Sequence, residues 1–107
     1  MDWKSQLDHE FKQAEQARKN KNEGQARVCA RRAAGIAIRE YLNHKGIRPS
    51  STSSYDLLNL IKDNPLLSLD LRLFAEHLTL RVTEEFKLPV NVDLVEEARK
   101  LCNELLK

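Results

Sequence analysis

The sequence predicts an all-α fold, an antiparallel bundle of four main helices and one short helix, and three observations support this prediction. Apolar residues recur at steps of three and four along most of the chain. No run alternates with period two for long enough to predict a strand, and glycine and proline are scarce and mostly fall where helices should end. The 107 residues suffice for one hydrophobic core, so we expect a single domain over residues 1–107.

Each predicted helix has recognisable ends. In chain order the predicted helices run from Asp2 to about Lys21, from Gln25 to Lys45, from Ser53 or Ser54 to near Asp63, from Ser68 to about Phe86, and from Asp93 onward. Asp2 can cap the first helix, and Asp93 with Glu96 resembles a capping box. Gly46 ends the second helix and Pro65 blocks continuation of the third.

The second helix carries mostly small side chains on its predicted inner face. These residues are Ala26, Cys29, Ala30, Ala33, Ala34, Ile36, Ala37 and Tyr41. Small side chains let neighbouring helices approach closely. Cys29 and Cys102 both fall on apolar faces, so we expect two buried free thiols. Without a CxxC pair or a nearby histidine pair they form no zinc site, and we expect neither a metal nor a cofactor.

Charge and hydropathy narrow the functional classes. The chain has 18 basic and 16 acidic residues, a net charge of +2, which excludes polyelectrolyte-like nucleic-acid binding but leaves room for a local basic patch. No stretch approaches the roughly 18 apolar residues of a membrane helix, and the first residues lack a signal-peptide core. We therefore expect a cytoplasmic protein with no membrane partner.

The second helix also has a basic side, which we place opposite its alanine face. It carries Arg27, Arg31, Arg32 and Arg39, with Gly35 among them. Arginine forks suit phosphate oxygens, so this side is a candidate surface for RNA or phosphate, where Gly35 would allow a backbone to come close. The alternative is a solvated helix face with salt-bridge partners.

The fourth helix is apolar on two sides. Leu67, Leu71, Phe74, Leu78 and Val82 form the predicted core face, and Leu66, Leu69, Leu73 and Leu80 form a second stripe almost opposite. In so small a domain both stripes must be covered. Either a neighbouring helix of the same chain covers the second stripe, or another subunit does. We expect the second stripe to be a dimer interface.

Residues 14–18 (AEQAR), 26–46 (ARVCARRAAGIAIREYLNHKG) and 55–61 (YDLLNLI) resemble the HEPN family. That family has a helix, a short turn, an alanine-rich second helix that ends in glycine, a loop, a short leucine-rich helix and two more helices. The resemblance implies a homodimeric helical bundle, often encoded beside a small nucleotidyltransferase in toxin–antitoxin pairs. Many members are metal-independent RNases with an arginine and a histidine separated by four to six residues.

One match to that catalytic motif is present, Arg72 with His77. The resemblance implies that the histidine would act as general acid or base and that the arginine would hold the scissile phosphate. The family's motif usually has a polar residue where this chain has Leu73. On a continuous helix Arg72 and His77 lie about 140° apart, so they converge only if the helix breaks or if two subunits share the site.

These observations predict a dimeric HEPN-like module for nucleotide- or RNA-associated binding, or of toxin–antitoxin type, without strong catalysis. The expected partners are a second copy of the chain, a nucleotidyltransferase-type protein, and RNA or a nucleotide. Two alternatives remain. One is a metal-independent endoribonuclease toxin that uses Arg72 and His77, and the other is a helical protein-interaction adaptor.

Overall fold

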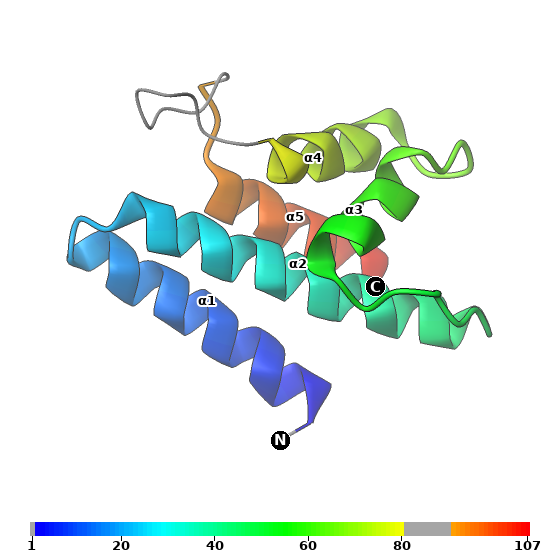
Figure 1. Cartoon of the computed structure of the whole chain (residues 1–107), viewed down its shortest axis with the longest axis horizontal. Coiled ribbons are helices and arrows are strands. Elements are labelled where there is room, and N and C mark those ends of the chain that lie inside the picture. The colour runs from blue at the N-terminus through cyan, green and yellow to red at the C-terminus, as the bar shows by residue number, and fades with distance from the viewer. Residues whose placement is uncertain (1, 81–90) are drawn as a thin grey trace.

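The computed structural model describes residues 2–80 and 91–107, and these residues form five helices and no strand. The helices are α1 Trp3–Lys19, α2 Glu23–His44, α3 Ser54–Lys62, α4 Leu69–Thr79 and α5 Leu94–Leu105 (Figure 1). The predicted all-α bundle is confirmed. No helix in the described ranges is long and apolar enough to cross a membrane.

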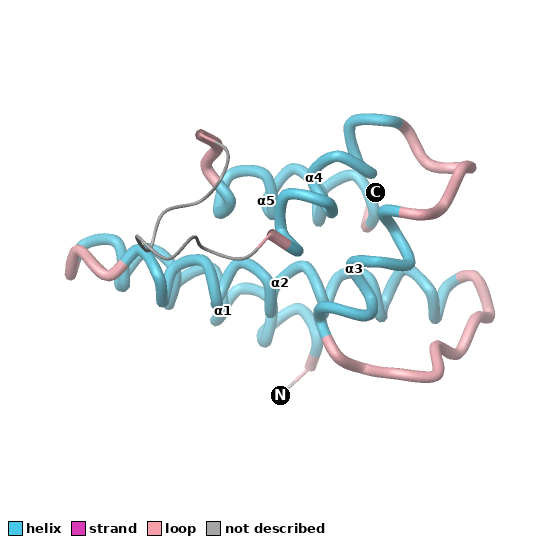
Figure 2. The backbone as a smooth tube through the Cα atoms, turned by 45° about the horizontal axis from the view of Figure 1, so that its top comes forward, coloured by secondary structure: helices cyan, strands magenta, loops and turns pink. Residues whose placement is uncertain are grey.

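Helix α2 is the centre of the bundle. It contacts each of the other four helices. In Figures 1 and 2, α1 runs antiparallel to α2 along its length, while α3, α4 and α5 lie on the other side of α2. Helices α4 and α5 pack against each other and run in opposite directions. The position of every candidate site residue is therefore set by its relation to α2.

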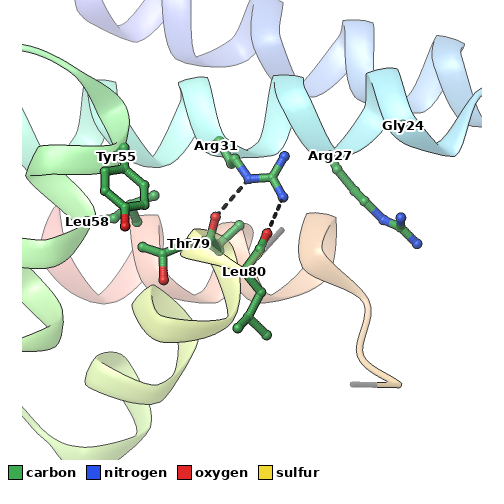
Figure 3. A pocket seen from close by; sticks show the side chains of 8 residues that line it. Gly24, Arg27, Arg31, Tyr55, Leu58, Thr79 and Leu80 are labelled. Carbon is green, nitrogen blue, oxygen red and sulfur yellow. Dashed lines mark hydrogen bonds between the residues drawn. The ribbon is translucent and has the colours of Figure 1, made fainter. Parts of the chain in front are cut away.

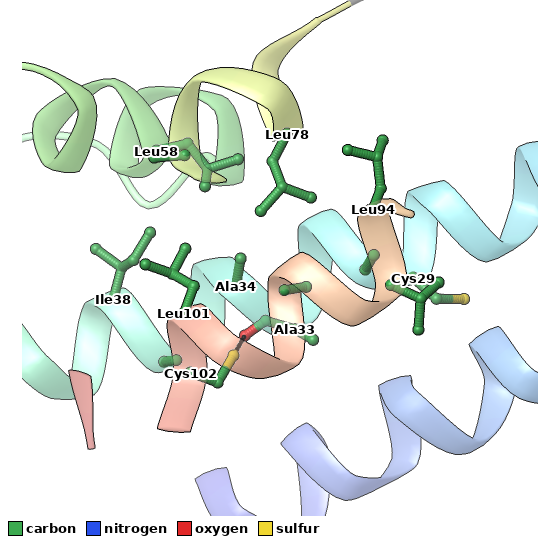
Figure 4. Close-up of a cluster of buried hydrophobic side chains, with 14 of the residues drawn as sticks. Cys29, Ala33, Ala34, Ile38, Leu58, Leu78, Leu94, Leu101 and Cys102 are labelled. Atoms are coloured by element: carbon green, nitrogen blue, oxygen red, sulfur yellow. Dashed lines mark hydrogen bonds between the residues drawn. The ribbon is translucent and has the colours of Figure 1, made fainter. Parts of the chain in front are cut away.

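The alanine face of α2 forms the middle of the core (Figure 4). Its five alanines, Ala26, Ala30, Ala33, Ala34 and Ala37, are fully buried. Larger side chains from the surrounding helices fill the space above them, among them Leu58, Leu78, Leu94 and Leu101. The sequence placed Ile36 and Tyr41 on the inner face, but they are only half-buried. Ile38 and Leu42 are buried instead, because other helices cover α2 on more than one side.

Polar side chains cap the helices where the sequence predicted. The Asp2 carboxylate accepts from the Ser5 backbone N–H at 2.7 Å, and the Asp93 carboxylate accepts from the Glu96 N–H at 3.0 Å. Helix α2 begins two residues earlier than predicted, because the Asn22 side chain caps it and the preceding turn is made by a residue with positive φ, Lys21 at 59°. Gly24, which falls between the first two predicted helices, lies inside the first turn of α2.

Helix α4 is shorter than predicted. It ends at Thr79, because Leu80 is extended with ψ of 143°. The rest of the predicted continuation toward Phe86 lies outside the described residues. The Thr79 hydroxyl donates to the Glu76 carbonyl at 2.6 Å. The Arg31 guanidinium donates to the carbonyls of Leu78 and Leu80 at 2.8 and 2.9 Å, and so satisfies acceptors that a longer helix would have used. Val82 and Phe86 lie outside the described residues.

Gly35 lets α3 approach α2. The sequence placed this glycine on the basic side of α2, but it is buried. A Cβ at position 35 would stand 3.1 Å from the Ser54 Cβ and 3.3 Å from the Ser54 Cα, and it would meet the Ser54 hydroxyl even more closely. Because Ser54 is the first residue of α3, the missing Cβ fixes how closely α3 begins against α2.

We expect Gly35→Ala to lower the free energy of unfolding by about 1–2 kcal/mol. The helix propensity of alanine favours the change by about 1 kcal/mol, but the overpacking against Ser54 costs more. Gly24→Ala is the matched control, because its nearest neighbour would be the Asn22 Oδ1 at an ordinary 3.8 Å, and it should leave stability equal or higher. Urea denaturation followed by circular dichroism measures both. Equal midpoints for the two variants would show that α3 does not depend on Gly35.

Candidate functional site

The second leucine stripe predicted for the fourth helix is largely exposed, although Leu66 lies in the turn before α4 and not on the helix. Leu66 is 91% exposed, Leu69 is 75% and Leu73 is 41%, while Leu80 is half-buried. The opposite side of α4 carries Leu71 and Leu78 in the core, as predicted. No helix among the described residues covers Leu66, Leu69 or Leu73. We call the four residues Leu66, Leu69, Leu73 and Leu80 the leucine face.

Arg72 and His77 lie on opposite flanks of α4. The helix is continuous from Leu69 to Thr79, so the helix break that would bring them together within one subunit is absent. The Arg72 Nε donates to the Lys62 carbonyl at 3.1 Å, which ties it to the end of α3. His77 Nδ1 contacts both carboxylate oxygens of Glu97 in α5, at 2.9 and 3.0 Å.

Both members of the predicted catalytic pair therefore hold helices together. Arg72 satisfies a carbonyl at the C-terminus of α3, one of the acceptors that a helix end leaves without a partner. The His77 and Glu97 side chains are only 15% and 13% exposed and join α4 to α5. A phosphate held by Arg72 would not reach His77 of the same chain. A shared site would need two subunits.

The structure divides the four arginines of α2 into two pairs. Arg27 and Arg31 line a groove of about 580 Å³ between α2 and the ends of α3 and α4 (Figure 3). Arg32 and Arg39 are exposed on another side of the helix. Arg32 points about 140° away from Arg27 around the helix axis. The predicted single basic side of α2 is therefore two separate sites.

Arg31 is a structural cation. Its two hydrogen bonds to the carbonyls of Leu78 and Leu80 use much of the guanidinium (Figure 3). Burial, and to a lesser extent the charge of Arg27, lowers the pKa of Arg31 from its usual value. Such a group stabilises the carbonyl end of α4 through the helix dipole. It is poorly placed to bind an external phosphate.

Arg27, Arg32 and Arg39 remain available to a ligand. None of these three makes a hydrogen bond or ion pair with a residue in the described part of the chain. Arg32 and Arg39 are seven residues apart, so they point in nearly the same direction about two helical turns apart. They are the arginines best placed to contact an extended phosphate backbone.

The groove beside Arg27 is mainly apolar. Leu58, Leu78 and Leu80 line it, with Tyr55 and Thr79 at the α3 and α4 sides. Tyr55 is 52% exposed. The sequence did not indicate this exposure, because Tyr55 belongs to the short leucine-rich helix. The hydropathy pattern of α3 likewise did not show that Leu60 is 49% exposed.

A further ionic cluster, which the sequence did not predict, fixes the start of α5. The Arg18 guanidinium donates to Glu23 and Asp93, each at a shortest distance of 2.7 Å, and joins the end of α1 to the starts of α2 and α5. Hydrogen bonding to Glu23 and Asp93 raises the pKa of Arg18, and hydrogen bonding to Arg18 holds the pKa of Asp93 below its usual range. Since Glu97 lies one turn after Asp93, this cluster also sets the position of the His77 partner.

The two cysteines are buried and free, as predicted. Burial raises the pKa of the Cys102 thiol to about 12 and also raises the pKa of the Cys29 thiol, where the nearby Glu10 carboxylate adds to the effect. Thiols with raised pKa values are poor nucleophiles at neutral pH. Among the residues that the structure describes, no group of three histidine, cysteine, aspartate or glutamate side chains is arranged to hold a metal ion.

No family model matches this chain, and no curated protein or solved structure matches it either. The resemblance to the HEPN family therefore rests on the residues quoted above. Three structural features bear on function. They are the exposed leucine face, the separate positions of Arg72 and His77, and the two groups of α2 arginines.

Proposed function

We propose that the chain is a HEPN-like helical module that acts as a homodimer and works by binding, with RNA, a nucleotide or a nucleotidyltransferase-type protein as its partner, in the manner of a toxin–antitoxin module. It has no strong catalytic activity of its own. The observation that carries this proposal is the leucine face of α4, which the described helices leave open to solvent.

The leucine face supports dimerisation through its size and position. Three large apolar side chains, exposed between 41% and 91%, follow one another along one short segment of chain. Single exposed leucines are common on soluble proteins, but a contiguous apolar patch marks an interaction site. A homodimer covers such a patch with the same patch of a second copy.

The positions of Arg72 and His77 on opposite flanks of α4 support binding over catalysis, and their contacts hold them there. Releasing Arg72 would leave the Lys62 carbonyl without its partner, and releasing His77 would leave the half-buried Glu97 carboxylate without its partner. Each loss destabilises the packing of α4 against its neighbours. The endoribonuclease alternative keeps a route only through a site shared by two subunits.

We expect the purified protein to be a dimer and the double variant Leu69→Glu with Leu73→Glu to be a monomer. Each substitution would place a carboxylate in the centre of an apolar contact. Size-exclusion chromatography with light scattering measures the mass. Ile47→Glu is the control, because Ile47 is 49% exposed but lies in the loop after α2. A wild-type monomer at every concentration would contradict the proposal and favour the adaptor alternative, in which another protein covers the leucine face.

Arg31 should have a different role from Arg32 and Arg39, and an RNA-binding assay can distinguish them. We expect Arg32→Gln with Arg39→Gln to weaken binding of single-stranded RNA by at least about tenfold and to flatten its salt dependence, because two charge-assisted phosphate contacts are lost. Arg31→Gln should instead lower the free energy of unfolding by about 2 kcal/mol, through the loss of its carbonyl contacts. Fluorescence anisotropy and urea denaturation measure the two effects. RNA affinity that does not change with salt or with either arginine would exclude a phosphate-contact role.

RNA incubated with the protein and a chelator should stay intact. Arg72→Ala and His77→Ala should look the same as wild type in this assay, since the two side chains do not meet in one subunit. Chelator-resistant cleavage that both substitutions abolish, with helical content unchanged, would instead establish the endoribonuclease alternative. Gel analysis of end-labelled RNA is the measurement.

A further inference from the structure

We propose that α4 pairs antiparallel with α4 of the second copy, about a two-fold axis that passes between Leu73 and Phe74. This inference rests on the proposed function, in which the leucine face joins two subunits. Helix α4 lies along one edge of the bundle (Figure 1), and Leu69 and Leu73 on it are exposed. The leucine face supplies the apolar centre of the contact, and charged side chains on its two flanks set the direction.

Each flank of the leucine face carries one acidic and one basic residue. Arg72 and Glu76 are four residues apart and share one flank, while Asp70 and His77 are seven residues apart and share the other. Within the described residues, neither the Asp70 nor the Glu76 carboxylate has a hydrogen-bond or ion-pair partner. Both carboxylates are exposed.

An antiparallel two-fold pair brings Arg72 and Glu76 of the two copies together on one flank and Asp70 and His77 on the other, where His77 also contacts Glu97 of its own chain. In such a pair each flank meets the same flank of the second copy, and residues equally far from the axis stand opposite each other. Asp70 then faces His77 of the partner subunit at the same height, and Arg72 faces Glu76 of the partner subunit within about 1.5 Å of the same height. Leu73 meets its own copy, and Leu69 meets Leu80 of the partner subunit.

A parallel pair fits less well. It would set Arg72 beside Asp70 of the partner subunit, about 3 Å out of step along the axis, and Glu76 beside His77 of the partner subunit, about 1.5 Å out of step. It would also align the two helix dipoles, which repel each other when parallel and attract when antiparallel. The antiparallel pair has better matched charges and opposed dipoles, so it is the arrangement that this face favours.

The direction of the pair decides whether a shared catalytic site can form. In the antiparallel pair, the flank that carries Arg72 meets the same flank of the second copy. The leucine face therefore separates each Arg72 from both His77 side chains. In a parallel pair the Arg72 flank would meet the His77 flank of the second copy. The proposed pairing therefore excludes an Arg72–His77 site across this interface.

Cysteine cross-linking tests the direction. We expect Leu73→Cys to form a disulfide-linked dimer on oxidation and Leu69→Cys not to form one. Facing Cα atoms near the axis fall within disulfide reach, whereas the two copies of residue 69 would stand about 14 Å apart along the helices. Wild type is the control, since Cys29 and Cys102 are 1% and 3% exposed and should not cross-link. Non-reducing gels measure the linkage, and light scattering on reduced samples measures the dimer.

The outcomes separate the two proposals. A reduced dimer in which only Leu73→Cys cross-links supports the antiparallel pair. If the reduced protein is a dimer and both variants cross-link, the pair is parallel. If it is a dimer and neither variant cross-links, or only Leu69→Cys does, the two copies are joined in another way. Both results overturn the pairing but leave a homodimer. A reduced wild-type monomer overturns the proposed function itself, and the pairing with it.

Discussion

Close packing on the alanine face of α2 is the constraint on which the rest of the structure depends. Five fully buried alanines let the neighbouring helices approach at short range, and the larger side chains of those helices complete the core. Gly35 extends the same principle to α3, because its missing Cβ admits the first residue of that helix. Any enlarged side chain on this face would push a helix outward and move the candidate sites attached to it.

Charged residues then fix the outer helices to this centre. Arg31 on α2 holds the carbonyl end of α4, Arg72 on α4 holds the end of α3, and His77 on α4 holds Glu97 on α5. Arg18 fixes the start of α5 through Asp93. Three of the six charged residues that the sequence marked as functional are therefore structural contacts between helices.

The sequence predicted the elements that depend on local pattern and missed those that depend on tertiary contact. The caps at Asp2 and Asp93 follow from residue type at a helix start, and the exposed leucine face follows from helical periodicity. The end of α4 could not be predicted, because it depends on Arg31 from a helix 47 residues earlier in the chain. The grouping of the four α2 arginines on one side was wrong for the same reason. Other helices pack around most of α2, and these tertiary contacts divide the arginines.

In the proposed function α4 serves as an interface, and the positions of its side chains argue against a catalytic site within one subunit. A catalytic site within one subunit would need Arg72 and His77 to meet, but Arg72 is held toward α3 through its Nε and His77 is held toward α5 through its Nδ1. Arg72 engages the Lys62 carbonyl through its Nε alone, so its remaining donors can meet a carboxylate at the edge of an interface without loss of the intramolecular contact. Helix α4 is only about 16 Å long. A contact along one such helix is smaller than the interfaces of stable complexes, which bury about 1,000 Å² or more, so the proposed pairing would be reversible on dilution.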